Sequence, residues 1–297
     1  MGYLNGPVNT LADFQLEFNG LLMGAGTPYD MPPTWHLMDM APIKTMDASR
    51  VWADGSWSGP DYADVLLIDL PVTVAASDAE TFTAAVNALA MVCVPQTSTA
   101  ALWFKLPNQV ARGISAKTNK RVLPIDLGWP RISDGAIQFR CPDPAWQSIP
   151  STVTLSPSGQ AVSGLSFPLF APASGTYTSP GALDFGFTAS GSSSPSLATL
   201  TNTGNSPAWP VVVLGASSAP VSVVIDGNYV TYGAAIPSGS SVTIDYKAGT
   251  ATISGGVDRT YALTARNFTP VTSSSSAIFV AAPSSAACTI TTANVWR

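Results

Sequence analysis

The start of the chain alternates apolar and polar residues in a way that is typical of a β-hairpin. Phe14, Leu16 and Phe18 alternate with polar residues, and Asn19-Gly20 comes directly before a second apolar run. This dipeptide favours a type I′ turn, because both central residues of that turn need a positive φ. The pattern therefore predicts two short antiparallel strands joined by this turn.

An amphipathic helix is predicted further along the first half of the chain. Its apolar residues lie three or four positions apart, which places them on one face of a helix. They are Phe82, Val86, Leu89 and Cys93. Ser77-Asp78-Ala79-Glu80 has the form of a capping box with the Ser77 hydroxyl as the cap, and Pro95 ends the pattern. We expect the helix to span Asp78 to Val94 and to lie on a sheet.

Short apolar runs around this helix predict strands, and the segments between them predict turns and loops. Residues 27–42 are rich in proline, methionine and aromatic residues and are interpreted as an ordered loop, whereas Asp54-Gly55 indicates a turn. Cys141–Trp146, with its two prolines, ends this first unit. The predicted strands are Val65–Val74, Ala101–Leu106, Val122–Leu127 and Ala136–Arg140.

The second half of the chain has a different rhythm. Ser148–Ser196 is dominated by Ser, Gly, Pro and Thr, but aromatic residues recur in it, which favours short strands with long turns over a disordered linker. From Ala198 to Trp296, short apolar runs recur about every 8–12 residues, as in a β-sandwich. The recurring aromatic residues of the first stretch are Phe167, Phe170, Tyr177, Phe185 and Phe187.

The strands of the last region are separated by turn residues. The predicted strands are Trp209–Leu214, Val221–Asp226, Ser241–Tyr246, Thr250–Ser254, Tyr261–Ala265, Ile278–Ala281 and Cys288–Thr292. The separators are Asp226-Gly227-Asn228, Pro237-Ser238-Gly239, Lys247-Ala248-Gly249 and Gly255-Gly256. The sequence therefore predicts a mainly β protein with two domains, residues 1–147 and residues 148–297.

The composition indicates a surface that neighbouring proteins cover. Hydrophobic residues make up 46% of the chain, whereas charged residues make up 10%, against about 25% in typical soluble domains. Such a low charge density suits a chain with little free surface, although a secreted Ser/Thr-rich β protein can be equally poor in charge. The net charge of −5 argues against a nucleic-acid binder, because phosphate neutralisation needs clustered Lys and Arg.

Basic residues, cysteines and apolar runs point to no special chemistry. The densest basic stretch, Arg112–Arg121, is interpreted as a solvated loop or a protein contact. Cys93, Cys141 and Cys288 lie far apart and are expected to be buried free thiols made in a reducing cytosol. No signal peptide is expected, and no apolar run has the roughly 20 residues that a membrane helix needs.

No catalytic, cofactor-binding or metal-binding residue is predicted, and we expect a protein that is not an enzyme. His36 is the sole histidine and is interpreted as a packed or partly exposed loop residue. Asp226-Gly227-Asn228 lacks the later ligands of a calcium loop and is interpreted as a hairpin turn. Four aspartates lie close in sequence, but a glycosidase needs two carboxylates about 5–10 Å apart in a sugar-sized cleft. They are Asp54, Asp61, Asp64 and Asp69.

The eight tryptophans leave two interpretations open. Trp35, Trp52 and Trp57 fall in one loop-rich region, and aromatic faces can stack on sugars. Tryptophan is equally enriched at protein–protein interfaces. An interface or core role is favoured here, and a sugar contact is the alternative.

A series of segments, taken in order, covers nearly the whole chain. In the first half they are Leu16-Glu-Phe-Asn-Gly20, Gly24-Ala-Gly-Thr-Pro-Tyr29, Asp54-Gly-Ser-Trp-Ser-Gly-Pro-Asp-Tyr62, Phe104-Lys-Leu-Pro107, Leu123-Pro-Ile-Asp126 and Ile137–Trp146. In the second half they are Phe167-Pro168, Thr201-Asn-Thr-Gly204, Ala208-Trp-Pro210, Val242-Thr-Ile-Asp245 and Ile253-Ser-Gly255. This series resembles the distal tail proteins of long-tailed bacteriophages, particularly the minor tail proteins of phages that infect actinobacteria.

The resemblance implies both a fold and a role. The N-terminal domain would be a tail-tube-like β-sandwich or barrel with one α-helix, and the C-terminal domain would be a galectin-like β-sandwich that faces outward. Six copies would form a hexameric ring at the tail tip that connects the tail tube to the baseplate or tail-tip hub. The implied partners are further copies of the chain, the tail tube protein, the tape-measure protein and baseplate hub proteins.

The implied place is the virion tail tip, after assembly in the cytoplasm of the host bacterium. DNA would pass through the ring without specific binding, and no membrane insertion is expected. We therefore expect Asp or Glu side chains of the first domain to line the bore and Arg112–Arg121 to point away from it. The alternative role is a carbohydrate-binding adhesin, a receptor-binding component of the tail.

Overall fold

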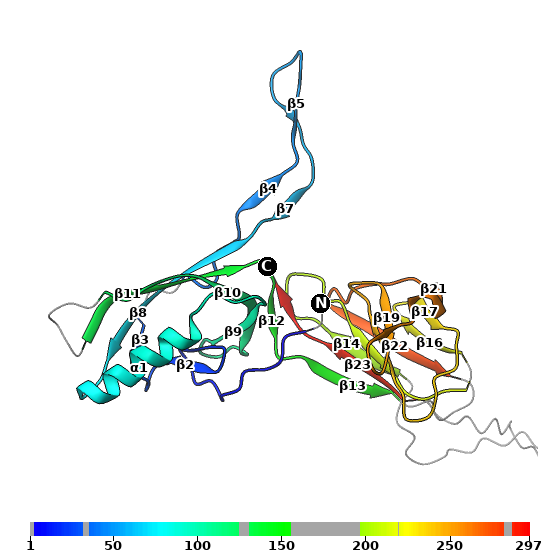
Figure 1. The fold of residues 1–297 in the computed structure, drawn as a ribbon. Coiled ribbons are helices and arrows are strands. Elements are labelled where there is room, and N and C mark those ends of the chain that lie inside the picture. The colour runs from blue at the N-terminus through cyan, green and yellow to red at the C-terminus, as the bar shows by residue number, and fades with distance from the viewer. Residues whose placement is uncertain (1–2, 32–35, 125–130, 156–196, 219, 282–286) are drawn as a thin grey trace, which may run out of the picture. The chain divides into compact units, whose positions relative to one another are not determined.

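The computed structural model describes residues 3–31, 36–124, 131–155, 197–218, 220–281 and 287–297, which form two compact units (Figure 1). The first unit comprises residues 2–151, 202–208 and 292–297, and the second comprises residues 152–201 and 209–291. The chain therefore crosses between the units four times. The described residues are mainly β with one α-helix, as the sequence predicts.

A curved antiparallel sheet forms the body of the first unit. Its strands lie in the order β2-β1-β9-β10-β11-β8-β3, while β12 pairs with β10 and β24 pairs with β12. The two ends of this path, β2 and β3, contact each other, so that the sheet nearly closes into a barrel. The bounds are β1 Gln15–Phe18, β2 Leu21–Gly24, β3 Tyr29–Asp30, β8 Leu66–Ala75, β9 Ala100–Lys105, β10 Arg112–Val122, β11 Arg131–Cys141, β12 Trp146–Ser148 and β24 Val295–Trp296.

The long strand β10 belongs to both halves of this barrel. Its residues 112–116 pair with β9, and its residues 117–122 pair with β11. The interpretation of Arg112–Arg121 as a solvated loop is therefore wrong. Its many small and polar residues do not alternate with apolar ones as in a typical strand. It is a strand because β9 and β11 pair with its backbone. The strand predicted from Val122 onward is displaced as well, because Val122 ends β10 and residues 125–130 lie outside the described chain.

Two other patterns of the first half are confirmed. β8 buries every second residue from Leu66 to Val74, which the apolar run predicted as a strand. The opening hairpin places Phe18 opposite Leu21, and its turn has positive φ at Asn19 (49°) and Gly20 (84°). The Asn-Gly pair therefore sets the register of the first two strands.

The helix α1 spans Ala79–Val92, close to the predicted bounds, but its cap differs from the prediction. Asp78 is the N-cap, and its carboxylate accepts hydrogen bonds from the backbone N–H of Thr81 at 2.8 Å and from the Thr81 hydroxyl at 2.9 Å. The Ser77 hydroxyl instead donates to Asp78 at 3.0 Å. A carboxylate is favoured at this place, because its charge complements the positive end of the helix dipole.

One face of α1 packs against the barrel. Phe82, Ala85 and Leu89 are buried on it, and the helix contacts β8 and β2. The Tyr29 hydroxyl of β3 donates a buried hydrogen bond of 2.8 Å to the carbonyl of Ala85. The helix thus covers the place where the two ends of the sheet meet, as expected of an amphipathic helix lying on a sheet.

Residues 43–64 form a hairpin that projects from the first unit and is called the arm here (Figure 1). Its base is closed by β4 and β7, and its outer part by β5 and β6. The sequence predicted only the turn at Asp54-Gly55, which lies at its far end. The bounds are β4 Ile43–Thr45, β5 Ala48–Ser49, β6 Ser56–Trp57 and β7 Asp61–Ala63.

The second unit is a β-sandwich of two antiparallel sheets. Their strand orders are β13-β23-β15-β18-β19-β20 and β14-β22-β16-β17-β21. Alternate side chains of most strands are buried, which is the pattern that the spacing of short apolar runs predicted. The bounds are β13 Ser151–Leu155, β14 Leu197–Thr201, β15 Val211–Leu214, β16 Val221–Ile225, β17 Asn228–Tyr232, β18 Val242–Asp245, β19 Thr250–Ile253, β20 Val257–Asp258, η1 Thr260–Ala262, β21 Leu263–Arg266, β22 Ser274–Ala281 and β23 Cys288–Thr292.

The predicted turns of this sandwich are confirmed, but one strand was missed. Asp226 and Gly227 have φ of 49° and 80° and join β16 to β17, so Asp226-Gly227-Asn228 is a hairpin turn. The strand β17 lies outside the predicted strands, because Asn228, which begins it, is also a typical turn residue. The short strands predicted around the aromatic residues of Ser148–Ser196 cannot be compared with the structure, because those aromatic residues lie in 156–196, outside the described residues.

A short loop of the second half returns to the first unit, which the sequence did not predict. The amide side chain of Asn202 is buried, accepts a hydrogen bond of 3.1 Å from the N–H of Val295 and donates one of 2.7 Å to the carbonyl of Ser206. A Cβ at Gly204 would lie 1.8 Å from the carbonyl oxygen of Val295, so only glycine permits this approach. The segment Thr201-Asn-Thr-Gly204 therefore holds β24 in place.

Reversing the polarity of the helix face tests its packing. Leu89 is fully buried, so Leu89→Asp should lower the free energy of unfolding of the first unit by at least about 3 kcal/mol. The exposed Thr83 provides the matched control, and Thr83→Glu should leave the urea-unfolding midpoint nearly unchanged. An unchanged midpoint for Leu89→Asp would contradict the assignment.

The cap predicts a pH-dependent effect. Hydrogen bonds from Thr81 and Ser77 lower the pKa of Asp78, so its contribution to stability is present above the ordinary carboxyl pKa of about 3.9 and is lost as the pH falls further. Asp78→Ala should lower the thermal midpoint at neutral pH more than Ser77→Ala does. This difference should shrink as the pH falls below about 4, and a difference that persists there would exclude a charged cap.

Candidate assembly surfaces

The described residues bring no catalytic group into a buried setting. The His36 ring nitrogen Nδ1 lies 3.1 Å from Asp39 in an exposed loop. The four neighbouring aspartates of the sequence are all exposed, and they are distributed over the arm and β8. Asp64 accepts a hydrogen bond from the N–H of Val65, and Asp69 accepts one from Gln138. These contacts are structural, and all four carboxylates lie on exposed residues.

Neither metals nor thiols give the described part of the chain a reactive site. No group of three or more His, Cys, Asp or Glu side chains is placed there to hold a metal ion. The thiols of Cys93, Cys141 and Cys288 are free and buried, as predicted. Burial raises the pKa of Cys93 to about 11 and those of Cys141 and Cys288 to about 12, so these thiols stay protonated and unreactive at neutral pH. No described helix is long and apolar enough to cross a membrane.

An open hollow of about 620 Å³ lies beside β1 and is lined in part by Glu17, Gln96 and Trp103. Glu17 is buried, but its carboxylate is fully used: it accepts hydrogen bonds from the N–H groups of Val8 at 2.8 Å and Asn9 at 2.7 Å. Its side chain therefore anchors the N-terminal segment on the sheet. This is the structural role of the glutamate in Leu16-Glu-Phe-Asn-Gly20.

Arg121 and Lys117 belong to the basic stretch Arg112–Arg121, for which a solvated loop or a protein contact is predicted and which lies in β10. The guanidinium of Arg121 donates to the carbonyls of Ala90 and Cys93, at 2.6 and 3.1 Å. It thereby satisfies the free carbonyls at the end of α1, where no basic residue of the helix itself does so. The ammonium group of Lys117 donates to the carbonyl of Thr97 at 2.9 Å. Part of the basic stretch thus fixes the helix end and the loop after it.

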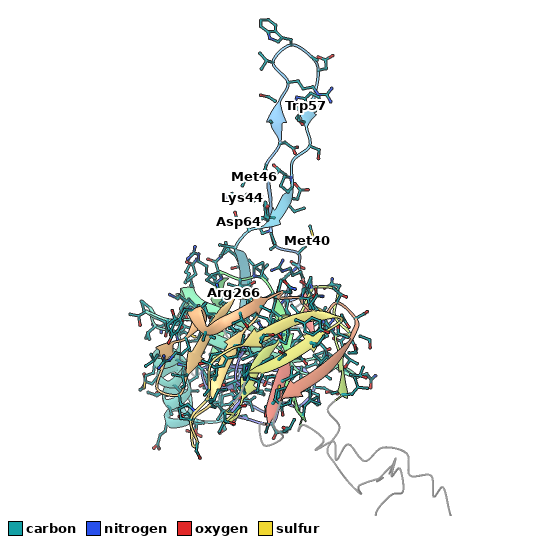
Figure 2. The ribbon with its side chains drawn as sticks, turned by 90° about the vertical axis from the view of Figure 1, so that its right-hand side faces the viewer. Met40, Lys44, Met46, Trp57, Asp64 and Arg266 are labelled. Atoms are coloured by element: carbon teal, nitrogen blue, oxygen red, sulfur yellow. The ribbon has the colours of Figure 1, made fainter. Side chains whose placement is uncertain are left out.

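The arm is the most exposed apolar feature of the described chain. Trp52 is 96% exposed and Val51 80%, and both lie at its far end. Trp57 is 65% exposed, and the guanidinium carbon of Arg50 lies 4.5 Å from the centre of its ring. Figure 2 shows Met46, Lys44 and Trp57 spaced along the arm, away from the sheet. Large exposed apolar patches often mark interaction sites, which makes the arm a candidate for one.

The segment Asp54-Gly-Ser-Trp-Ser-Gly-Pro-Asp-Tyr62 builds the returning half of the arm. Gly55 accepts a hydrogen bond of 3.3 Å from the N–H of Arg50, which closes the turn, and the N–H of Gly59 donates one of 2.9 Å to Asp47. Tyr62 pairs with Lys44 at the base. The tryptophans of the predicted loop-rich region, Trp52 and Trp57, therefore lie on an extended hairpin, whereas Trp35 lies outside the described residues.

A second open surface is the outer face of β8, β11 and β10, called the outer sheet face here. Its side chains alternate with core residues such as Ile68 and Phe139, so they point away from the core. Gln138 donates to Asp69 at 2.8 Å and accepts from Asn119 on this face. Across the three strands its rows are Leu67, Arg140 and Lys117; then Asp69, Gln138 and Lys120; then Pro71, Ala136 and Val122.

Comparisons with known proteins bear on the fold. No protein-family model and no curated protein matches the sequence. Among solved structures, the SPP1 Dit protein, described as a paradigm of the hub adsorption apparatus in phages that infect Gram-positive bacteria, matches with a TM-score of 0.62 at 10% identity. That match covers 95% of this chain and 99% of the other.

Two structures of the phage P2 baseplate in its activated conformation, with Ca and with Sr, also contain a similar chain. Their TM-scores are 0.52 and 0.51 at 9% and 10% identity, and each match covers 93% of this chain and 97% of the other. The matches thus extend over both units rather than over one of them. The chain therefore has the fold of phage hub and baseplate proteins over nearly its whole length, in agreement with its resemblance to the distal tail proteins.

Proposed function

We propose that this chain is a non-enzymatic structural subunit of a bacteriophage tail tip. The observation that carries the proposal is the match of both units, in order, to a hub protein over 95% of this chain and 99% of that one. An isolated sandwich or barrel recurs with many functions, so a single matching unit would carry little weight. The exposed arm and the low charge density support an assembly role as well.

The proposal extends to the ring that the resemblance implies. Six copies form a closed ring, the domain of residues 1–147 makes the ring contacts, and the domain of residues 148–297 faces outward. The ring joins the tail tube protein to the baseplate hub and surrounds the tape-measure protein and then the DNA. A carbohydrate-binding adhesin is not favoured, since the structural neighbours reported above come from a hub and from baseplates.

Electron microscopy of the purified full-length chain tests the ring. We expect negative-stain images of closed rings with six-fold symmetry, and light scattering should give a mass six times the 30.7 kDa of one chain. The full chain is required, because residues 202–208 and 292–297 complete the first unit. A monomer or a trimer that binds cell-wall glycan would contradict the proposal and favour the adhesin.

The ring should also let DNA pass without holding it. A basic wall would bind phosphates through counterion release, with an affinity that grows with each contact, whereas an acidic wall repels them. With a net charge of −5 per chain, we expect acidic side chains of the first domain to line the bore. Fluorescence anisotropy of a labelled duplex at roughly 0.15 M salt should show no binding to the assembled ring. Tight binding that weakens steeply with salt would refute this expectation.

A further inference from the structure

A small pocket in the first unit lies beside the base of the arm and combines arginine with aromatic side chains. Its volume is about 130 Å³, whereas pockets for drug-sized ligands begin at about 300 Å³, so it has room for a group of only a few heavy atoms. All of its lining residues belong to the first unit. They include Met40, Ala63, Arg112, Trp146, Trp296 and Arg297.

Arg112 is a partly buried cation without an anionic partner. Its Nε atom is buried and has no hydrogen-bond partner among the described residues, and no carboxylate of theirs forms an ion pair with it. Burial lowers the pKa of this guanidinium, because the charged form loses hydration. Since charges withdrawn from water are normally paired in proteins, this one indicates a place for an anion that the described chain does not supply.

The orientation of Arg112 is fixed by its contact with β24. Its guanidinium carbon lies 4.1 Å from the centre of the Trp296 ring, at the distance of a cation–π contact. Trp296 is itself held in place, because it pairs with Trp146 of β12 and because Asn205 and the backbone of Arg297 exchange two hydrogen bonds of 2.8 Å. A guanidinium that is already oriented loses less conformational entropy when it binds a ligand.

The acidic groups near the pocket have other partners. Asp39, which lines it, lies 3.1 Å from Nδ1 of His36. Asp143 lies 3.9 Å from the guanidinium of Arg297, whose side chain is 53% exposed, so this pair is long and is screened by water. Arg112 is therefore the unpaired cation of the pocket, and Arg297 is a second, weakly paired one.

We propose that this pocket binds a single carboxylate group on a short apolar stem, as a small free carboxylate or a glutamate side chain of a partner protein presents it. Arg112 recognises the carboxylate, since a guanidinium offers two parallel N–H donors that match its two oxygens. The side chains of Met40, Ala63 and Trp146 offer apolar surface to the stem. Phosphate is disfavoured, because it has no apolar part for these side chains to cover. The site does not depend on the ring proposed above, so either can fail without the other.

Thermal unfolding of the full chain in the presence of propionate tests the site. Propionate has the structure of a glutamate side chain, and propionamide is its neutral counterpart. Binding with a Kd of about 10 mM or tighter should raise the thermal midpoint by at least roughly 2 °C at about 50 mM propionate, since a ligand that binds only the folded state stabilises it. Propionamide at the same concentration, with the ionic strength matched by sodium chloride, should leave the midpoint unchanged. Equal shifts with both compounds, or no shift with propionate, would overturn the proposal.

Substitutions locate the effect. Arg112→Met retains packing against Trp296, because a thioether also contacts aromatic rings, and should abolish the propionate shift. Lys120→Met, at an exposed residue of the same strand, is the matched control and should keep the wild-type shift. A full shift in Arg112→Met would place the binding elsewhere and refute the proposal. If Arg112→Met does not fold, Arg297→Gln decides: its affinity for propionate should fall by at least about threefold, and an unchanged affinity would refute the site.

A blocked pentapeptide distinguishes the two sources of the carboxylate. Acetyl-Gly-Gly-Glu-Gly-Gly-amide presents the group as a protein would, and the same peptide with Gln in place of Glu is its control in isothermal titration calorimetry. Peptide binding at least as tight as that of propionate identifies an acidic side chain of a partner, whereas propionate binding without peptide binding identifies a small free carboxylate; either result supports the site. If inorganic phosphate stabilises the wild type through Arg112 and propionate does not, the choice of a carboxylate is wrong.

Discussion

The first unit depends on the double pairing of β10. The backbone groups in its first half pair with β9 and those in its second half pair with β11, so this one strand joins the two halves of the nearly closed sheet. Because buried backbone groups need partners, displacing either half of β10 would leave backbone N–H and C=O groups of the neighbouring strand unpaired. The same strand supplies Arg121, which holds the end of α1, and Arg112, whose guanidinium carbon lies 4.1 Å from the centre of the Trp296 ring of β24. Side chains of β10 therefore contact both the end of the helix and the final strand.

Local patterns predicted those elements whose signal is contained in a few neighbouring residues. The Asn19-Gly20 turn, the alternation in β8 and the helical face of Phe82 and Leu89 were found in this way, because turn geometry and burial act on each of them separately. The sequence of β10 does not indicate a strand, because four of its eleven residues are basic and it has no regular alternation of apolar and polar residues; the pairing with β9 and β11 makes it a strand. The capping-box pattern favours Ser77 as the cap, because Glu80 follows it by three residues, whereas Asp78 is the N-cap in the structure; both residue types are favoured at this place, and only the backbone geometry decides between them.

The surfaces proposed for assembly were less accessible to sequence reasoning than the fold. The tryptophans near Asp54 mark the right region, but no local pattern indicates that residues 43–64 leave the body as a hairpin. Short strands with small and polar residues carry no periodicity that distinguishes them from a loop. Likewise, the rows of the outer sheet face arise from the register of three strands, of which β8 is separated from β10 by residues 76–111. Spatial neighbours of this kind become visible only once the pairing is known.

The fourfold crossing of the chain between the two units has a consequence for biosynthesis. Because residues 202–208 and 292–297 belong to the first unit, the ribosome has to deliver the second unit before the first can be completed. Until then β12 lacks β24, and the edge of the barrel remains open. A nascent or truncated chain would thus expose the edge of β12, whereas β24 pairs with that edge once residues 295–296 are in place. Subunits with and without their last residues therefore differ at this strand edge before they meet a partner.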